Sequence, residues 1–320
     1  MRQTVLITGS SGFVGGFLAN LYADAGWDVH GTVRNDTASG VLQRITLHHL
    51  DLEDTGAVRE LIGVCRPMVV HHLAAQSSVR VSAAQPLATL ISNLVMQRNI
   101  LDAVAASAYG TRVVVVGSAD EYGCVKRAEN PVSEDQPLLP VSAYGLSKVG
   151  QDLMGYEFFA AHALPVVRVR PFLQIGPRRP DRFAAGSFAR QVAEIEAGRR
   201  EPRIDVGNID QVRDMCDVRD VARAMRLAAE SGQAGAVYNI ASGEGHTHRE
   251  LIRLMLEMAG VQAEIHEDRS RRRPVEPEVI IGDSSRLRAD TGWSPAIDFR
   301  TSVRDTLEYW RERVSRCDER

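Results

Sequence analysis

Residues 4–16 read Thr-Val-Leu-Ile-Thr-Gly-Ser-Ser-Gly-Phe-Val-Gly-Gly, and this stretch decides the fold. The run Thr4–Thr8 predicts a buried strand, and the loop Gly9-Ser10-Ser11-Gly12-Phe13-Val14-Gly15 leads into a helical pattern over Val14–Ala25. Glycines allow a tight turn, and a helix N-terminus presents free N–H groups and a positive dipole. A glycine triplet also occurs in plain turns, but its place at a strand–helix junction favours a pyrophosphate-binding loop.

The same alternation of short apolar runs and amphipathic segments continues to Pro171. The further strand candidates are Asp28–Val33, Ile45–His49, Met68–Leu73, Arg112–Ser118 and Pro165–Arg170, and the further helix candidates are Thr55–Cys65, Pro86–Ser107 and Ala143–His162. This pattern predicts an α/β protein with a Rossmann-type, doubly wound parallel sheet covered on both faces.

After Pro171 the alternation stops, and Gly, Pro and Arg become dense. We therefore expect a dinucleotide-binding domain over residues 1–171, to which segments near 203–241 return. Residues 172–320 are expected to form mainly a smaller, discontinuous α/β region that binds the substrate.

Length and charge exclude several classes of function. The chain has 320 residues, is 44% apolar and carries a formal net charge of -3. It can bury a full core, and it offers no overall positive field to a nucleic acid or an anionic membrane, so a small-molecule substrate is expected. The strand-like start leaves no room for a signal peptide, and no apolar run approaches the roughly 20 residues of a membrane-spanning helix.

Cysteine and histidine usage predicts no metal. No Cys-x-x-Cys pair is present, and the four cysteines stand far apart at Cys65, Cys124, Cys216 and Cys317. This spacing argues against a zinc site and a disulfide framework and fits a reducing cytoplasm. The histidines show no metal-like spacing with carboxylates and are interpreted as structural or solvated, namely His48, His49, His162, His246 and His248.

The end of the second predicted strand indicates the cofactor. Enzymes that prefer NAD usually carry an acidic residue there for the ribose hydroxyls, whereas this chain has Val33-Arg34-Asn35. Arg34 offers a cation to a 2′-phosphate and favours NADP(H), although it could also be a solvated arginine at a loop start.

Two later strand ends complete the expected cofactor site. Asp51 and Leu52, after the third strand, are expected to bracket the adenine. The backbone of Leu73, Ala74 and Ala75, after the fourth strand, is expected to pass beside the nicotinamide ribose.

Three residues form a candidate catalytic group. Tyr144 and Lys148 are four residues apart at the start of a helical stretch, so they lie on one face. A nearby ammonium favours phenolate over phenol, which lets the tyrosine exchange a proton with a sugar hydroxyl. Ser118 ends the fifth strand at the same sheet edge. A Tyr-x-x-x-Lys pair can also be a surface pair on an ordinary helix, but the glycine loop and the strand-terminal serine favour catalysis.

Together these motifs resemble the extended short-chain dehydrogenase/reductases that modify nucleotide sugars. The resemblance covers nearly the whole chain and rests on the glycine loop, His72-Leu73-Ala74-Ala75, Ser118 with Glu121-Tyr122-Gly123, and Tyr144-x-x-x-Lys148. Later motifs resemble the branch of GDP-mannose 4,6-dehydratases and GDP-4-keto-6-deoxymannose reductases, namely Val206-Gly207-Asn208-Ile209-Asp210, Arg213-Asp214, Asp217-Val218-Arg219-Asp220, Arg273-Pro274 with Glu276, and Thr291-Gly292-Trp293.

The resemblance also implies further site residues. Arg213 and Glu276 would help hold the GDP end of a GDP-sugar, and Arg178 or Arg179 would approach its phosphates through the planar arginine fork. These arginines could instead be solvated loop charge. The remaining implied cofactor contacts are Gln76, Asn93 and Pro171, and the remaining implied substrate contacts are Ser78, Gln174, Val206, Asn208 and Arg273.

The motifs leave the reaction open between two outcomes. A 4,6-dehydration needs an acid/base group for C5, and Asp120 occupies the place of the glutamate that does this in dehydratases. Its shorter side chain and the neighbouring Ala119 are departures, and reductases of this branch also carry an acid there.

Leu173-Gln174 replaces the usual Asn-His and suggests an altered sugar, such as a GDP-manno-heptose. We favour an NADP-dependent 4,6-dehydratase of GDP-mannose or GDP-manno-heptose, with the NADPH-dependent 4-keto reductase as the alternative. A non-catalytic sensor is disfavoured because the Tyr/Lys pair is intact.

The dehydratase hypothesis gives each residue a role. Tyr144, lowered in pKa by Lys148, accepts the C4 hydroxyl proton with Ser118 as hydrogen-bond partner, while hydride passes to NADP. Asp120 or Glu121 then takes the C5 proton and assists loss of water, and hydride returns to C6.

Two long helices suggest self-association. Pro86–Ser107 and Ala143–His162 carry apolar residues on more than one face. Related enzymes pair these helices across a four-helix interface, so a homodimer is expected, with a tetramer left open and a monomer as the alternative.

Overall fold

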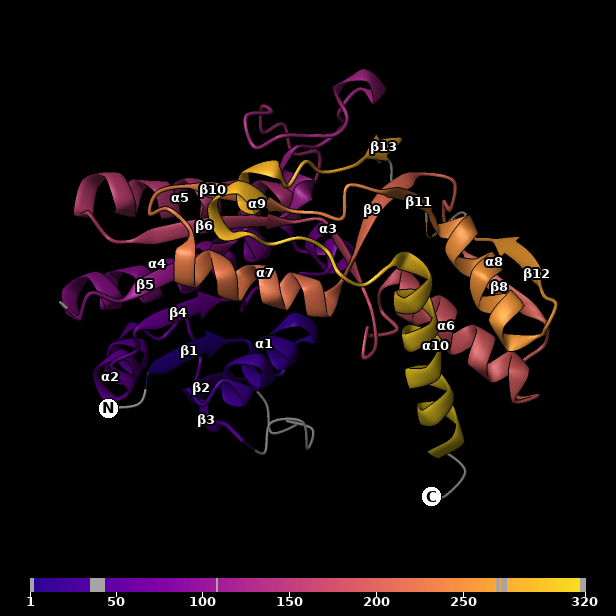
Figure 1. Ribbon diagram of the computed structural model, residues 1–320, viewed down its shortest axis with the longest axis horizontal. Helices are drawn as coiled ribbons and strands as arrows, with labels where there is room; N and C mark the ends of the chain where they lie inside the picture. The colour runs from indigo at the N-terminus through magenta and orange to yellow at the C-terminus, as the bar shows by residue number, and fades with distance from the viewer. Residues whose placement is uncertain (1–2, 35–43, 108, 269–270, 272–274, 317–320) are drawn as a thin grey trace.

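The computed structural model describes residues 3–34, 44–107, 109–268, 271 and 275–316. Within these residues, seven parallel strands form the central sheet in the order β10-β6-β5-β4-β1-β2-β3 (Figure 1). Their bounds are β1 (Thr4–Thr8), β2 (Asp28–Val33), β3 (Thr46–His49), β4 (Val69–His72), β5 (Arg112–Val116), β6 (Val166–Pro171) and β10 (Val237–Ile240). The predicted doubly wound parallel sheet is confirmed, and β10 lies within the segment near 203–241 that is expected to return to this domain.

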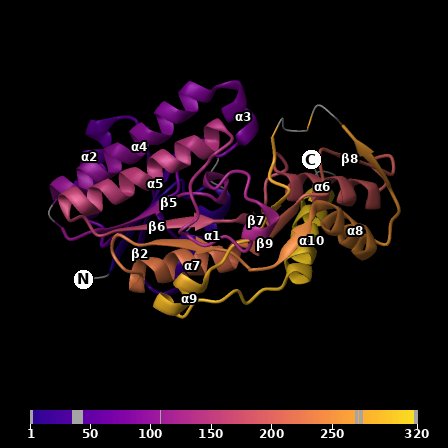
Figure 2. The ribbon, with the colours of Figure 1, turned by 90° about the horizontal axis from the view of Figure 1, so that it is seen from above.

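Helices cover both faces of this sheet. On one face lie α1 (Phe13–Asp24), α7 (Val218–Ser231) and α9 (Ser285–Thr291), and on the other lie α2 (Thr55–Cys65), α4 (Pro86–Ser107) and α5 (Ala143–His162). Figure 2 shows α4 and α5 side by side. The short helix α3 (Val79–Ala84) precedes α4 and was not predicted.

Side-chain caps fix where two of the helices that cover the central sheet begin. The Asp54 carboxylate accepts hydrogen bonds from the amides of Gly56 and Ala57, at 2.8 and 3.0 Å, and starts α2. The Ser142 hydroxyl accepts from the amide of Gly145 at 3.0 Å and starts α5. These contacts satisfy amides that have no partner inside a helix. The cap on α5 places Tyr144 in its first turn.

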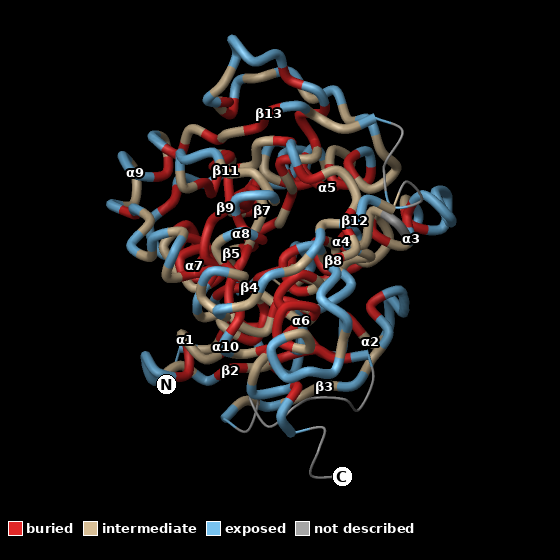
Figure 3. The backbone as a smooth tube through the Cα atoms, turned by 90° about the vertical axis from the view of Figure 1, so that its right-hand side faces the viewer, coloured by how far each residue is buried: buried red, intermediate tan, exposed pale blue. Residues whose placement is uncertain are grey.

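A second, smaller lobe has its own core. Strands β7 (Leu173–Ile175), β9 (Val212–Asp217), β11 (Gly245–Thr247) and β13 (Val279–Ile280) form one small sheet, and β8 (Arg203–Val206) pairs with β12 (Glu264–Glu267). Three amphipathic helices pack on them, α6 (Ala184–Glu196), α8 (His248–Ala259) and α10 (Phe299–Arg316). Figure 3 shows buried segments mainly toward the middle of the molecule and exposed ones mainly at its outer turns. In the described part of the chain, no helix combines the length and apolarity needed to cross a membrane.

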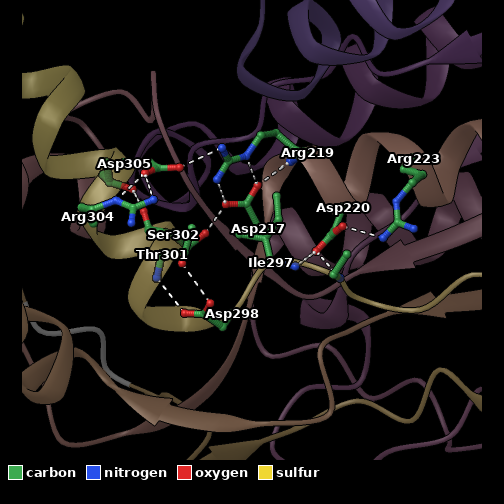
Figure 4. Close-up of polar contacts among 12 residues, drawn as sticks. Asp217, Arg219, Asp220, Arg223, Ile297, Asp298, Thr301, Ser302, Arg304 and Asp305 are labelled. Atoms are coloured by element: carbon green, nitrogen blue, oxygen red, sulfur yellow. Dashed lines mark hydrogen bonds and ion pairs between the residues drawn. The ribbon is translucent and has the colours of Figure 1, made fainter.

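Aspartates at the start of α7 connect the two lobes (Figure 4). The buried Asp217 carboxylate caps α7 by accepting from the Arg219 amide at 2.8 Å, and it also accepts from the Ser302 hydroxyl of α10. Asp220 accepts from the amides of Ala296 and Ile297, each at 2.8 Å. The motif Asp217-Val218-Arg219-Asp220 thus connects α7 both to α10 and to the chain just before it.

Candidate active site

The glycine loop leaves the start of α1 open to a ligand. Gly9 has φ +66°, and a Cβ there would lie 3.1 Å from the backbone of Ala74. A Cβ on Gly15 would lie 2.4 Å from the Gly9 carbonyl oxygen, so both positions require glycine. Among the described residues, no side chain caps the first amides of α1, and its first turn holds no acid. Exposed Ser11 and Gly12, with half-buried Phe13 and Val14, border a helix N-terminus suited to a pyrophosphate.

Arg34 and Asp51 lie beside each other at the ends of β2 and β3. Arg34 Nη2 is 3.5 Å from Asp51 Oδ2, and both side chains are mostly exposed. The pair lies at the edge of the sheet where an adenosine 2′-phosphate would bind. Leu52 is only 5% exposed and its side chain lies in the core, so the expected contact with the adenine stays a prediction that would involve its backbone.

The segment after β4 is held by buried polar groups. The Thr8 hydroxyl accepts from the Ala74 amide at 3.0 Å, and Asn93 Oδ1 accepts from the Gln76 amide at 2.8 Å. Asn93 is fully buried and also donates to the Ser147 hydroxyl at 2.9 Å. Asn93 therefore shapes the backbone around half-buried Leu73, Ala74 and Ala75 rather than offering a free amide to a cofactor.

Ser118, Tyr144 and Lys148 meet at the carboxyl edge of the sheet. Tyr144 is hydrogen-bonded to the Ser118 side chain, and Lys148 Nζ lies 5.9 Å from the centre of the Tyr144 ring. Burial raises the pKa of Tyr144 above its usual value, nearby Asp120 raises it further, and the Ser118 hydrogen bond opposes them. Burial has the largest effect on this pKa, and the expected lowering of it by the Lys148 ammonium stays a prediction.

Lys148 is a buried ammonium with a defined environment. Its Nζ donates to the carbonyl oxygen of Val116 and to Oε1 of Gln151, each at 2.8 Å. Burial lowers the pKa of Lys148 to about 8, and the charge of Glu121 opposes that shift. Gln151 was missed, although its spacing of three residues from Lys148 and seven from Tyr144 places all three on one face of α5.

The two acids after Ser118 have different environments. Asp120 is half-buried and close enough to Tyr144 to affect its pKa. Glu121 is completely buried, and its Oε1 accepts from the Ser118 amide at 2.7 Å. Its Oε2 lies 3.1 Å from Arg170, so it faces the interior. This orientation corrects the expectation that Glu121 could act on a substrate and leaves Asp120 as the candidate acid/base.

Arg178 and Arg179 lie against the first turns of α1. The Arg178 guanidinium lies 5.1 Å from the Phe17 ring, and that of Arg179 lies 4.9 Å from Phe13 and 4.1 Å from Phe183. Arg179 is only 8% exposed, and its Nε has no hydrogen-bond partner among the described residues. Burial lowers the pKa of Arg179 to about 10, partly opposed by Tyr144. Both arginines thus border the phosphate loop, and Arg179 also faces the tyrosine.

The expected GDP contacts lie in the second lobe. Arg213 is in β9, and Glu276 accepts a hydrogen bond from Gln211, two residues before Arg213. Half-buried Asn208 lines a cavity of about 170 Å³. Val206 is 1% exposed and packs in the lobe core, but it also borders this cavity, so its expected contact with a substrate stays a prediction.

The remaining expected site residues occupy varied places. Gln174 is half-buried in β7, Ser78 caps α3, and Pro171 is a buried residue at the end of β6. Arg273 lies outside the described residues.

Comparison with known proteins identifies the family. A family model described as GDP-mannose 4,6 dehydratase matches residues 6–306. The GDP-6-deoxy-D-mannose reductase of Pseudomonas aeruginosa is 35% identical over 314 residues, which cover 98% of this chain and 99% of the relative. GDP-mannose 4,6 dehydratase 1 of Arabidopsis thaliana is 27% identical and covers 95% of this chain and 88% of the relative.

Solved structures agree in fold. The structure of RMD from Pseudomonas aeruginosa complexed with NADPH matches with a TM-score of 0.86 at 33% identity, covering 98% of this chain and 100% of the other. A UDP-glucose 4-epimerase from Thermotoga maritima matches with a TM-score of 0.88 at 26% identity, with the same coverage. The resemblance to extended short-chain dehydrogenase/reductases is confirmed, and the protein belongs to the GDP-mannose 4,6-dehydratase family of nucleotide-sugar enzymes.

Proposed function

We propose that the protein is an NADPH-dependent 4-keto reductase that converts a GDP-linked 4-keto-6-deoxymannose into the corresponding 6-deoxy sugar nucleotide. The observation that carries this proposal is the 35% identity, over nearly the full length of both chains, to a GDP-6-deoxy-D-mannose reductase. Seven GDP-mannose 4,6-dehydratases are 25–28% identical to this chain. The motifs alone favoured the dehydratase, and this difference reverses the order of the two candidates.

The cofactor site suits NADP(H). The uncapped amides of α1 and the tight Gly9 and Gly15 contacts leave space and positive potential for a pyrophosphate. Arg34 at the end of β2 supplies a cation for a 2′-phosphate. NADPH, when bound, supplies the hydride that becomes the hydrogen on C4.

The proton chemistry then falls to three residues. The keto oxygen at C4 gains a proton from the Tyr144 phenol, which burial keeps protonated at neutral pH. Ser118, hydrogen-bonded to Tyr144, orients the same oxygen. The Lys148 ammonium lies close enough to stabilise the phenolate that remains. The carbonyl bond is reduced to an alcohol, and solvent restores the tyrosine proton.

A 4,6-dehydratase is the second candidate. The half-buried Asp120 next to Tyr144 occupies the position expected for the C5 acid/base, and the family model carries the dehydratase name. In that reaction hydride would leave C4 and return to C6 of the same sugar, so no net NADPH would be consumed.

Reductant consumption separates the two reactions. Purified protein would be given GDP-4-keto-6-deoxymannose with NADPH, and separately GDP-mannose and GDP-manno-heptose without added reductant. We expect one NADPH oxidised per keto sugar and no product from the other two. Formation of a 4-keto-6-deoxy sugar without added reductant would establish the dehydratase instead.

We also propose that the protein is a cytoplasmic homodimer joined through α4 and α5, with a tetramer as the further possibility. These neighbouring helices expose large apolar side chains, namely Leu87, Ile91, Leu146, Leu153 and Tyr156. Such a patch on paired helices favours association with a second copy. Sedimentation of Leu153→Glu should give monomers and that of Leu164→Met dimers; a monomeric wild-type protein would exclude the dimer.

A further inference from the structure

Three side chains that are distant in the sequence converge beside β2 and β3. His30 Nδ1 lies 2.8 Å from His48 Nε2, and Cys65 Sγ lies 3.3 Å from the first atom and 3.7 Å from the second. His30 is in β2, His48 is in β3, and Cys65 is the last residue of α2. Each residue offers one ligand atom, and the three atoms lie within 4.8 Å of one another.

The fold explains why these side chains meet. In the parallel pairing of β2 with β3, Thr32 lies opposite His48, so His30 and His48 are on the same face of the sheet two positions apart. That face is covered by α2, whose final turn brings Cys65 over the two rings. The spacing in the sequence cannot show this cluster, because the three residues come from three separate elements.

We propose that His30, His48 and Cys65 form a binding site for one Zn²⁺ ion, which links β2, β3 and α2. Two imidazole nitrogens and one thiolate are ligands that zinc prefers, and three protein ligands leave a fourth position for water. On binding, the Cys65 S–H bond breaks, its proton passes to solvent, and the thiolate donates to the metal without any change of oxidation state.

The distances in the cluster are close to those of such a site. Zinc bonds of about 2.0 Å to nitrogen and about 2.3 Å to sulfur, in tetrahedral arrangement, separate two nitrogens by about 3.3 Å and nitrogen from sulfur by about 3.5 Å. The two nitrogen–sulfur distances, 3.3 and 3.7 Å, bracket that value. The two nitrogens, at 2.8 Å, need only to separate slightly.

A carboxylate supports the first ligand. Asp28 Oδ2 lies 3.4 Å from His30 Nε2, on the side of the ring opposite the cluster. A proton held on Nε2 by this carboxylate leaves the lone pair of Nδ1 facing Cys65 and His48. Metal-binding histidines commonly have such a carboxylate partner, which orients the ring.

The site lies at the exposed edge of the sheet. β3 is a four-residue strand that pairs only with β2 among the described residues. A metal bridge would fasten this strand to its neighbour and to α2. The ends of the same two strands lead to Arg34 and Asp51, so the proposed metal stabilises the edge that carries the candidate 2′-phosphate contact without touching the reacting groups.

Metal binding can be measured without any assay of activity. Chelator-treated protein would be titrated with Zn²⁺ and separately with Co²⁺, with bound metal measured after gel filtration and thiolate-to-Co²⁺ charge transfer measured by absorption. Wild type should bind about one equivalent with a Kd below about 1 µM. Melting temperature should rise with added Zn²⁺.

Matched variants locate the metal. Cys65→Ser and His48→Gln should lose the charge-transfer band and weaken binding at least about 100-fold, and Asp28→Asn should weaken it about tenfold. Cys124→Ser removes an exposed cysteine outside the cluster and should bind like wild type. Absence of stoichiometric binding, equal binding by Cys65→Ser, or loss of binding in Cys124→Ser would each overturn the proposal.

Discussion

The Oε1 atom of Glu121 accepts a hydrogen bond at 2.7 Å from the amide of Ser118, whose side chain affects the pKa of Tyr144. Burial and the charge of Asp152 raise the pKa of Glu121 above its usual value, while Arg170 opposes this shift. The carboxyl group therefore acts as a support for the strand end and does not reach the reacting atoms. Substitutions of Glu121 should therefore change the reaction rate differently from substitutions of Asp120.

Substitution of Glu121 should reveal a positioning role. Glu121→Gln keeps an acceptor for the Ser118 amide and should lower kcat by less than about tenfold. Glu121→Ala leaves that buried amide unpaired, at a cost of about 1–3 kcal/mol, and should lower kcat further with KM for NADPH unchanged. Steady-state kinetics on both variants checks this. A larger loss in Glu121→Gln than in Glu121→Ala would contradict it.

Asp120→Asn distinguishes the two candidate reactions at the residue level. A reductase needs no base at C5, so the variant should retain NADPH-dependent reduction of the keto sugar within about tenfold of wild type. A dehydratase should lose about 10²–10⁴-fold in its dehydration rate when its acid/base group is removed. Product analysis by NMR measures both. An Asp120→Asn enzyme that no longer reduces the keto sugar would argue against the proposed roles.

The reduction rate should depend on the charge of Lys148. Its pKa, lowered by burial to about 8, means that the ammonium is present at neutral pH and is lost as pH rises through that value. Without this charge the phenolate formed at Tyr144 is less stable. We therefore expect kcat/KM to fall about tenfold per pH unit above pH ~8. The control is Lys148→Arg, which keeps its charge and should be slower but nearly flat across that range. A wild-type profile that is flat to pH ~10 would contradict the prediction.

Arg34 should set the cofactor preference. Its exposed guanidinium beside Asp51 is placed to meet a 2′-phosphate, and a charge-assisted hydrogen bond contributes about 1.5–3 kcal/mol. Arg34→Ala should therefore bind NADPH about 10- to 100-fold more weakly and NADH equally well, as measured by fluorescence titration. Arg44→Ala, which removes an exposed arginine paired with Asp24, serves as the control. Equal weakening of the binding of both cofactors would show that Arg34 does not contact the 2′-phosphate.

Asp220→Ala should destabilise the fold. The variant leaves the amides of Ala296 and Ile297 without their acceptor and separates Arg223 from its buried partner. Its free energy of unfolding in urea should fall by about 2–4 kcal/mol. Asp102→Ala, which breaks an exposed pair with Arg98, should cost less than about 1 kcal/mol. Similar losses in the two variants would show that the Asp220 contacts contribute little.

The sequence predicted the elements whose signals are local. The bounds of α2, α4 and α5 match their predicted ranges, because helical periodicity and capping residues operate within a few turns. The strands of the second lobe were not predicted, since they have two to six residues and are stabilised by partners far along the chain. Propensity carries little information over such short segments.

The direction of individual side chains was the second property that the sequence did not predict. The motifs predicted that Ser118, Tyr144 and Lys148 lie near one another, as they do. They did not predict that Glu121 and Asn93 point inward and accept hydrogen bonds from backbone amides. Burial of Val206 likewise depends on how α6 and α8 pack in the second lobe. Period and spacing place a residue on an element, whereas its exposure depends on the tertiary neighbours of that element.

The position of β10 in the chain means that the central sheet can be completed only late in synthesis. It pairs with β6, although the second lobe's β7, β8 and β9 lie between them along the chain. A nascent chain leaving the ribosome can therefore align its first six parallel strands while the outer edge of β6 still lacks a neighbour. An unpaired strand edge can pair with other polypeptides, so the edge of β6 is open to such pairing until β10 has been synthesised.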